Sequence, residues 1–363
     1  MALKRTRVVV GMSGGVDSSA TAALLLEQGY DVVGITLKLW PQDCISRAED
    51  KCCGPQAVTD ARAVCHKLGI PYYLIDEAAE FQTKVIQYFA DEYKAGRTPN
   101  PCVMCNQNLK FGRLIERADQ LGAQYIATGH FARVEKSPET ARTWLKRGHD
   151  PRKDQSYFLF SLGQQQLARA LFPLGEKTKA DTREVARQCQ LKTADKEESM
   201  EICFVPDNDY GKFLRQAKLA QTHRGEIVNV EGHVLGFHEG IEFYTIGQRK
   251  GLGISSPRPL YVLDLDPAAN RVVVGGDVSG LERDEFIAER CNWIAYDPPP
   301  ESVAATVKIR YNHPGAAATV TPLASGRAKV KLHTPQRAVT PGQAAVFYQD
   351  DLVLGGGWIS LQR

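Results

Sequence analysis

Residues 8–19, Val-Val-Val-Gly-Met-Ser-Gly-Gly-Val-Asp-Ser-Ser, decide the fold of the amino-terminal part of the chain. Three consecutive valines are typical of a short strand that is buried on both faces of a parallel sheet. A helical pattern follows from about Ser18 to Gln28. Between the two, Gly14 and Gly15 can adopt positive φ and let backbone N–H groups approach a ligand closely. These N–H groups, the Ser18 hydroxyl and the positive end of the helix dipole together predict a polyphosphate-binding loop.

The loop is not a Walker loop, because it lacks the Gly-Lys-Ser/Thr ending that grips a γ-phosphate. Its SGGVDS sequence resembles instead the PP-loop of ATP pyrophosphatases, which cleave ATP to AMP and pyrophosphate. An ordinary strand–turn–helix junction is the alternative interpretation. The glycines, Asp17 and the paired serines all favour the phosphate loop.

The composition is that of an ordinary globular protein. A length of 363 residues predicts two or three domains. With 45 Lys and Arg against 42 Asp and Glu, the net charge is +3, so a polyanionic partner must bind a local basic patch. No apolar run approaches the length of a membrane span, and residues 1–7 do not resemble a signal peptide. We therefore expect a cytoplasmic protein, no membrane partner, and nine cysteines that are mostly reduced.

Strand and helix patterns alternate through the first part of the chain. Strands are expected at 31–39, 72–75 and 125–128, and helices at 56–68, 78–94 and 110–121. This alternation predicts an α/β fold with a doubly wound parallel sheet, which binds ligands at the carboxyl ends of its strands. The glycine loop lies at one such end, and Gly129 and His130 lie at another.

The pattern changes beyond about residue 205, where Val, Gly and short alternating runs predominate. Strands are expected at 260–265, 271–274, 303–311, 328–333 and 344–348. In 303–311 and 328–333, one face is apolar and the other basic. This pattern fits a small antiparallel barrel whose outer surface could bind phosphates. From these two strands alone, a solvated strand face is the favoured interpretation of the basic residues.

Two cysteines are candidates for chemistry because of their context. Cys102 and Cys105 lie in TPNPCVMCN (98–106), where two prolines argue against helix just before the pair. We therefore expect a loop leading to the next helix, whose N-terminus would lower the pKa of a nearby thiol. A CxxC pair can be a redox pair, half of a metal site or a structural accident, and the loop context makes accident the least favoured. Cys203 follows much later, next to apolar residues.

The other cysteines have simpler interpretations. Cys65 is expected to be a small core residue, and Cys189 and Cys291 to be structural. Cys44, Cys52 and Cys53 cluster in a polar insertion, where the spacing supports a metal site only weakly.

Taken together, these motifs resemble the bacterial tRNA-specific 2-thiouridylases, which convert the wobble uridine of certain tRNAs to 2-thiouridine. The resemblance runs almost from end to end of the chain. Its motifs are GMSGGVDSS (11–19), EYKAGRTPNPCVMCN (92–106), YIATGH (125–130), KDQSYFL (153–159), EICF (201–204), TIGQRKGLG (245–253), KIRY (308–311) and TPGQAAVFY (340–348). It implies a PP-loop catalytic domain at 1–205, a small central domain at 206–280 and a C-terminal antiparallel β-barrel that binds tRNA at 281–363.

The resemblance also implies roles for individual residues. ATP, with Mg²⁺, would be held by Gly11, Met12, Ser13, Gly14, Gly15, Val16, Asp17, Ser18, Leu37 and Gly129. Asp17 would hold the metal or its water. Cys105 matches the family's nucleophile, and Cys203 matches the cysteine that carries a persulfide supplied by a sulfur-donor protein or cysteine desulfurase. Asn100, Pro101 and Cys102 would border the target base. Other tRNA contacts would come from His130, Lys153, Asp154, Gln155, Arg310, Tyr311 and Gln343.

The sequence departs from many members of the family at one position, where Cys102 replaces an aspartate. A thiol there cannot be assumed to take over a role of that carboxylate in activating the base. Cys102, Cys105 and Cys203 are alternatively three ligands of a [4Fe-4S] cluster with one open iron. Arg249 and Lys250 are either phosphate contacts or exposed residues of a solvated loop.

The sequence is also compatible with two rival functions. PP-loop proteins include amide-forming synthetases, which also adenylate an oxygen but use nitrogen nucleophiles and need no cysteines. An RNA-binding module with a zinc knuckle is the non-enzymatic alternative, and it leaves the glycine loop unexplained.

Overall fold

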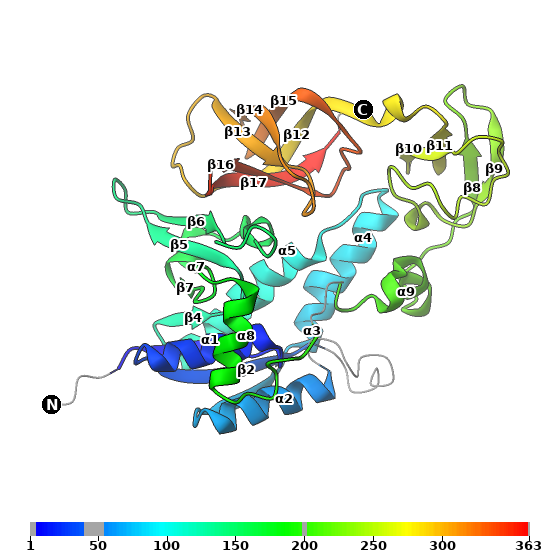
Figure 1. Ribbon diagram of the computed structural model, residues 1–363. Helices are drawn as coiled ribbons and strands as arrows, with labels where there is room; N and C mark the ends of the chain where they lie inside the picture. Colours follow the sequence, from blue (N-terminus) through cyan, green and yellow to red (C-terminus); the bar gives the residue numbers. More distant parts are fainter. Residues whose placement is uncertain (1–4, 40–53, 198–201, 362–363) are drawn as a thin grey trace. The chain divides into compact units, whose positions relative to one another are not determined.

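The structure, a computed structural model, describes residues 5–39, 54–197 and 202–361 and is drawn in Figure 1. The chain divides into two compact units. The first comprises Met1–Val85, Cys102–Phe204 and Asp351–Val353, and the second comprises Ile86–Pro101, Val205–Asp350 and Leu354–Arg363. Each unit is described by itself. The domain boundaries at 205 and 280 stay predictions.

The first unit is built on a parallel sheet with the strand order β3-β2-β1-β4-β7. Its strands are β1 (Arg7–Gly11), β2 (Asp31–Lys38), β3 (Tyr72–Asp76), β4 (Tyr125–Ala127) and β7 (Ala170–Leu171). The order reverses between β1 and β4, which makes a topological switch point at their carboxyl ends. The predicted doubly wound sheet is confirmed, and the glycine loop lies at this switch point.

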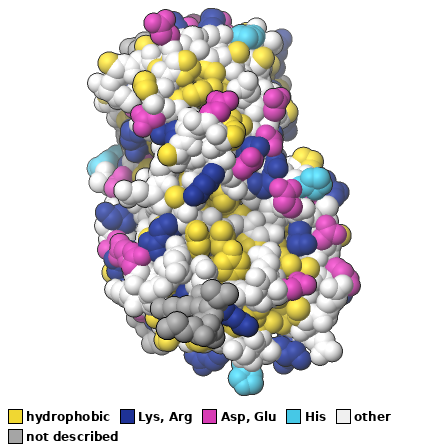
Figure 2. Space-filling model, turned by 90° about the vertical axis from the view of Figure 1, so that its left-hand side faces the viewer, with side chains coloured by type: hydrophobic (Ala, Val, Ile, Leu, Met, Phe, Trp, Pro, Cys, Tyr) yellow, Lys and Arg dark blue, Asp and Glu magenta, His cyan; other side chains and the backbone are white. Residues whose placement is uncertain are grey.

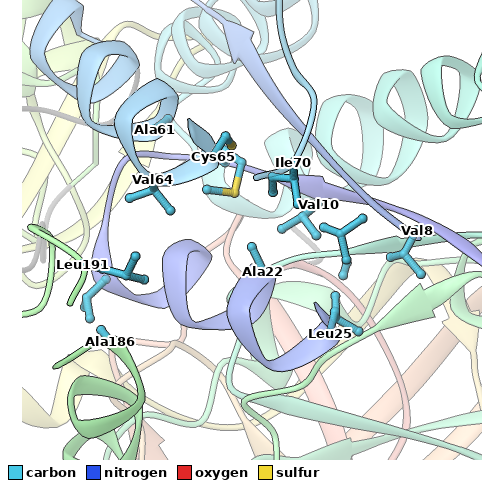
Figure 3. Packing of buried hydrophobic residues seen from close by; sticks show 14 of the residues in the cluster. Val8, Val10, Ala22, Leu25, Ala61, Val64, Cys65, Ile70, Ala186 and Leu191 are labelled. Atoms are coloured by element: carbon cyan, nitrogen blue, oxygen red, sulfur yellow. The ribbon is translucent and has the colours of Figure 1, made fainter. Parts of the chain in front are cut away.

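A buried apolar cluster joins the sheet to three helices, α1 (Val16–Glu27), α2 (Pro55–Lys67) and α8 (Lys179–Gln188). Val8 and Val10 of β1 point into this cluster (Figure 3), and Val9 is equally inaccessible to solvent. Both faces of β1 are therefore covered, as the valine run predicts. Cys65 lies inside the cluster, where burial raises the pKa of its thiol to about 12. Its interpretation as a core residue is confirmed.

The helix expected at 78–94 is present but irregular. It consists of α3 (Ala78–Phe81), the π-helical segment η2 (Gln82–Gln87) and α4 (Tyr88–Lys94). The helix expected from residue 110 begins earlier, as α5 (Pro101–Cys105), the π-helical η3 (Asn106–Arg113) and α6 (Leu114–Gln120). The expectation that Cys102 and Cys105 lie on a loop is therefore wrong. Proline is well tolerated at the first helical position, where its missing N–H would have no intrahelical partner.

The rest of the first unit contains short elements. A hairpin of β5 (Ala132–Lys136) and β6 (Thr143–Arg147) is followed by the 3₁₀ turn η4 (Ser156–Leu159) and α7 (Gln164–Ala168).

In the second unit, the chain after Val205 first forms η5 (Pro206–Asn208) and α9 (Tyr210–Gln216). A four-stranded sheet then has the order β10-β11-β8-β9. Its strands are β8 (Gly225–Val228), β9 (Val234–His238), β10 (Tyr261–Asp266) and β11 (Arg271–Gly275), with the 3₁₀ turns η6 (Ile241–Phe243) and η7 (Val278–Leu281). The sheet has its own apolar core, which includes Ile227, Val262 and Val272.

The predicted barrel is confirmed as six antiparallel strands in the order β12-β15-β14-β13-β16-β17, closed by pairing of β12 with β17. They are β12 (Glu282–Trp293), β13 (Val303–Lys308), β14 (Ala316–Leu323), β15 (Arg327–Arg337), β16 (Ala344–Gln349) and β17 (Leu352–Ser360). In β15, Val330 and Leu332 are buried, whereas Lys329 and Lys331 point outward to acidic residues of β12. Those two lysines are thus partly neutralised by the barrel itself.

The surface charge is mixed on the face shown in Figure 2, where Lys and Arg side chains are interspersed with Asp and Glu. Within the described parts of the chain, helices are too short or too polar for any to cross a membrane.

Candidate active site

Glycine is required at two positions of the site, where backbone segments approach each other closely. Gly14 has a φ of +72°, and a Cβ there would lie 2.2 Å from the carbonyl oxygen of Ala57 in α2. Gly129 follows β4, and a Cβ there would lie 2.8 Å from backbone and side-chain atoms of Asp17. The loops after β1 and β4 therefore meet at the start of α1, with backbone exposed where side chains would otherwise fill the space.

Hydroxyl groups shape the loop from within. The Ser13 N–H donates to Ser18 Oγ over 3.2 Å, and Ser18 Oγ and Ser19 Oγ donate to the Gly15 carbonyl over 3.1 and 2.8 Å. No side chain caps α1, whose N-cap residue is Gly15. The N-terminus of α1 thus offers backbone N–H donors and a partial positive charge, which suit an anion.

The neighbouring strand fixes the position of Met12. Its N–H donates to Ile35 of β2 over 2.8 Å, and Thr36 Oγ1 donates to the Met12 carbonyl over 2.7 Å. Leu37, also on β2, has a buried side chain, so only its backbone is available to a nucleotide.

Two lysines that were not predicted from the sequence reach the glycine loop. Lys179 Nζ lies 2.6 Å from Asp17 Oδ1. Lys196 Nζ donates to the Gly14 carbonyl over 3.1 Å and also pairs with Asp60 of α2. The one local signal was the Thr178–Asp181 capping box, which places Lys179 in the first turn of a helix, where the dipole disfavours a cation.

The two cysteines of the CxxC pair lie on α5. Cys105 is buried, and Cys102 is half-buried. Burial raises the pKa of the Cys102 thiol, and the nearby Lys110 ammonium opposes that rise only in part. The expectation of a lowered pKa is therefore wrong for Cys102, because the cost of desolvating a thiolate exceeds the electrostatic help of its surroundings.

The segment after Cys105 is held by hydrogen bonds to residues elsewhere in the first unit. Asn106 Nδ2 donates to the Phe158 carbonyl over 3.1 Å. Gln166 Nε2 donates to the carbonyls of Gln107 and Phe111 in η3, over 3.0 and 2.7 Å. These bonds satisfy backbone acceptors where the helix widens.

Both cysteine-bearing segments are attached to residues 77–81, immediately after β3. The buried carboxylate of Glu77 pairs with Arg113 and Arg117, each at 2.8 Å, and these arginines belong to the continuous helix that begins at Pro101. Phe204, which follows Cys203, packs its ring edge-on against Phe81 with 5.8 Å between centroids. The fold thus ties both segments to one helical turn at the carboxyl end of the sheet.

We expect Glu77→Gln to destabilise the first unit by about 2 kcal/mol, because two arginines would lose a buried carboxylate partner. Urea unfolding measures the change. Glu116→Gln is the matched control, because Glu116 pairs with the same Arg113 but is 55% exposed, and its loss should cost less than about 0.5 kcal/mol. Equal effects of the two substitutions would contradict the anchoring role of Glu77.

His130 is buried where β4 meets η3. Its Nδ1 lies 2.7 Å from Thr128 Oγ1, and its ring contacts Phe111 and Phe172, each with 6.1 Å between centroids. Burial, with a smaller contribution from Lys110, holds the pKa of His130 well below its ordinary value. The imidazole is therefore neutral at pH 7 and carries no charge for a phosphate.

This shift has a consequence for stability. The unfolded chain binds a proton at His130 near pH 6.5, whereas the folded protein resists it, so the stabilisation is complete above about pH 6.5 and is lost as the pH falls. Between pH 7.5 and 5.5, we expect the free energy of unfolding of the wild type to fall by about 1 kcal/mol more than that of His130→Gln. Urea unfolding at both pH values tests this, and parallel losses would contradict it.

The Lys153–Gln155 segment, predicted to contact tRNA, makes local bonds. Asp154 Oδ1 accepts from the N–H groups of Gly148 and Ser156 over 3.2 and 3.0 Å. Gln155 Oε1 accepts from the Phe131 N–H over 3.0 Å. These side chains shape the loop, and direct contact with tRNA stays a prediction for all three.

In the second unit, Gln343 supports the chain just before α5. Its Nε2 donates to the carbonyls of Thr98 and Pro99 over 3.1 and 3.0 Å. Asn100 is buried beside them. Gln343 therefore holds the backbone that leads directly into two other predicted contacts, Asn100 and Pro101.

The remaining predicted tRNA contacts lie on the surface of the second unit. Arg310 is exposed just beyond β13, and its Nη1 donates to the Arg337 carbonyl over 3.3 Å. Tyr311 is half-buried, with Lys308 Nζ 5.6 Å from its ring centroid. Arg249 and Lys250 are exposed on their loop.

The donor set does not fit an iron–sulfur cluster. Cys102, Cys105 and Cys203 all lie within the described residues, among which no three His, Cys, Asp or Glu side chains gather as metal ligands. The insertion with Cys44, Cys52 and Cys53 lies outside the described residues.

A doubly wound parallel sheet with an uncapped glycine loop at its switch point defines the PP-loop class of nucleotide-binding α/β proteins. Three family descriptions match consecutive segments: tRNA methyl transferase HUP domain (6–207), tRNA methyl transferase PRC-barrel domain (211–276) and aminomethyltransferase beta-barrel domain (283–359). The chain belongs to the tRNA-specific 2-thiouridylase family.

Relatives in this family match over nearly their whole length. The tRNA-specific 2-thiouridylase MnmA of Carboxydothermus hydrogenoformans is 50% identical over 98% of both chains. That of Geobacter metallireducens is 50% identical over 98% of this chain and 97% of its own. A solved 4-thiouridine synthetase–RNA complex with bound ATP is more distant, with 17% identity and a TM-score of 0.37 over 59% of this chain and 51% of that one.

Proposed function

We propose that this protein is a tRNA-uridine 2-sulfurtransferase, which uses ATP to convert the wobble uridine of tRNA to 2-thiouridine in the cytoplasm. One observation carries the proposal: the first unit contains both a PP-loop at its switch point and two cysteine segments tied to the same turn after β3. Amide-forming synthetases of the PP-loop class have no need for such cysteines.

The first step activates an oxygen that is otherwise a very poor leaving group. The C2 oxygen of uridine attacks the α-phosphate of ATP and displaces pyrophosphate, which leaves the base as its adenylate. The N–H groups of Gly14 to Asp17, the Ser18 hydroxyl and the backbone at Leu37 and Gly129 would hold the nucleotide. Mg²⁺, when bound through Asp17, would neutralise phosphate charge.

The second step transfers sulfur. The terminal sulfur of a Cys203 persulfide attacks C2, and AMP leaves with the former C2 oxygen. The Cys105 thiolate then attacks the inner sulfur of the Cys203–S–S–C2 adduct. The S–S bond breaks, the electron pair stays on the sulfur attached to C2, and a Cys105–Cys203 disulfide forms. A thiol reductant supplies two electrons to restore both cysteines, and a persulfide-carrying donor protein reloads Cys203.

The target base must leave its stack to reach this chemistry. Asn100 and Pro101, supported by Gln343, would border the base together with Cys102. Arg310, Tyr311 and Lys153 would contact the tRNA backbone, which positions the anticodon loop without reading its sequence. His130, being neutral and buried, would act through shape and hydrogen bonding.

Anaerobic incubation with Mg-ATP, a persulfide donor and unmodified tRNA tests the proposal. We expect 2-thiouridine in the digested tRNA, with one AMP and one pyrophosphate for each thiolated base, from colourless and iron-free protein. Activity that requires about four irons per chain would replace the persulfide route by a cluster. Bound zinc without pyrophosphate release would favour the RNA-binding module, and ATP turnover that is indifferent to both cysteines would favour an amide-forming synthetase.

A further inference from the structure

Lys179 occupies a position that is unfavourable for a cation unless an anion is to be bound there. It is the first residue of α8, where the helix dipole repels positive charge. The fold nevertheless fixes it with three contacts. Its backbone N–H donates to the buried Asp150 carboxylate, its Nζ lies 5.6 Å from the Phe131 ring centroid, and its Nζ pairs with Asp17.

The ammonium group of Lys179 is held at the N-terminus of α1. Asp17, its partner at 2.6 Å, is the second residue of α1. The Lys179 side chain is only 12% exposed, so its charge acts in a partly desolvated setting. The glycine backbone of the loop, the uncapped turn of α1 and this ammonium therefore face the same small region.

Lys196 reaches the same loop but is engaged differently. Its Nζ binds the Gly14 carbonyl and the Asp60 carboxylate, which links the loop to α2. This arrangement holds the conformation of the loop, and Lys196 is thus a positioning residue. Lys179 instead pairs with the Asp17 carboxylate at the N-terminus of α1, where a bound phosphate could replace Asp17 as its partner.

We propose that Lys179 binds the pyrophosphate part of ATP, and that its ammonium group forms an ion pair with the Asp17 carboxylate until the nucleotide binds. The inference rests on the proposed function and adds a specific residue to it. On binding of Mg-ATP, phosphate oxygens replace Asp17 as the partner of Lys179, and Asp17 becomes available to the metal. The exchange keeps both charges paired before and after binding, which avoids an isolated charge in a partly buried site.

Calorimetry with three probes tests the proposal: Mg-ATP, AMP and inorganic pyrophosphate. We expect Lys179→Met to weaken the affinity for Mg-ATP and for pyrophosphate by about tenfold or more. Its affinity for AMP should change by less than about threefold. Lys179→Arg should retain most of the affinity, because it keeps the charge. Lys192→Met, at an exposed lysine beyond α8, is the matched control and should bind all three probes like the wild type.

Substitution of Asp17 distinguishes binding by Lys179 from simple charge repulsion. Without metal, Asp17→Asn should bind pyrophosphate several-fold more tightly than the wild type, because the competing anion is gone. The double variant Asp17→Asn, Lys179→Met should bind it as weakly as Lys179→Met. Recovery of wild-type affinity in the double variant would show that Lys179→Met acts only by exposing Asp17, and would overturn the inference.

The outcomes separate this inference from the proposed function. Wild-type protein that binds neither ATP nor pyrophosphate would overturn the proposed function itself. Wild-type protein that binds both, with Lys179→Met binding them equally well, would overturn only the role of Lys179. Thermal unfolding of each variant confirms that a lost affinity does not reflect a lost fold.

Discussion

Cys105→Ser is expected to lower the rate of 2-thiouridine formation by about a thousandfold or more, while ATP binds as tightly as in the wild type. Serine keeps the size and the buried position of Cys105. Its hydroxyl is far less acidic than a thiol, however, and cannot displace a sulfur leaving group from the Cys203 adduct. The glycine loop is untouched, so nucleotide affinity should not change. Nucleoside analysis of the tRNA and calorimetry with ATP measure the two quantities.

Two further cysteine variants make the result specific. Cys189→Ser, at the half-buried C-cap of α8, should retain full thiolation. Cys102→Asp restores the residue found in many members of the family, and it reports whether the thiol at this position has a separate role. Retention of more than about a tenth of the wild-type rate by Cys105→Ser would remove Cys105 from the mechanism.

Gly14→Ala is expected to abolish detectable nucleotide binding and to destabilise the first unit by about 3 kcal/mol. An alanine Cβ would lie 2.2 Å from the Ala57 carbonyl oxygen, in a backbone conformation with φ of +72° that alanine disfavours. The loop and the start of α2 must then separate. Urea unfolding and ATP calorimetry measure the two effects.

Two other glycines separate the contributions. Gly29 has a φ of +86° but open space around it, so Gly29→Ala should cost only about 1 kcal/mol and leave ATP binding intact. Gly15 has a φ of −97°, and a Cβ there would make an ordinary contact 3.5 Å from Ser13 Oγ. Gly15→Ala should therefore disturb the fold far less than Gly14→Ala. Unchanged ATP affinity in Gly14→Ala would contradict the phosphate loop.

The sheet and barrel were predictable because each depends on patterns within a few residues. The valines of β1 are buried on both faces, and the alternation around Val330 and Leu332 separates the inside of the barrel from its surface. A period of two residues or an uninterrupted apolar run is readable without knowledge of the partner strand. The order of the strands was predictable only as a class of fold, because it depends on pairings between strands far apart in the sequence.

The parts of the site that escaped prediction depend on contacts between residues far apart in the sequence. Lys179 meets Asp17, and Glu77 meets two arginines of another helix, with no local pattern to announce either pair. The position of the cysteines was mispredicted for a different reason. Proline disfavours helix within an element and just before it, but at the first position of α5 it is a suitable helix start.

The π-helical form of η3 has a consequence for any change in the length of the chain there. A residue in such a segment turns less about the axis than in an α-helix, so η3 sets the angular phase between Cys105 before it and Arg113 at its end. Deleting one residue of η3 would let the backbone tighten into regular α-helix. Eight residues of η3 turn through about the same total angle as seven residues of α-helix. Cys105 and Arg113 would therefore keep their relative orientation about the axis, so the chain can lose one residue here without misdirecting the thiol, whereas it cannot lose one from a regular helix.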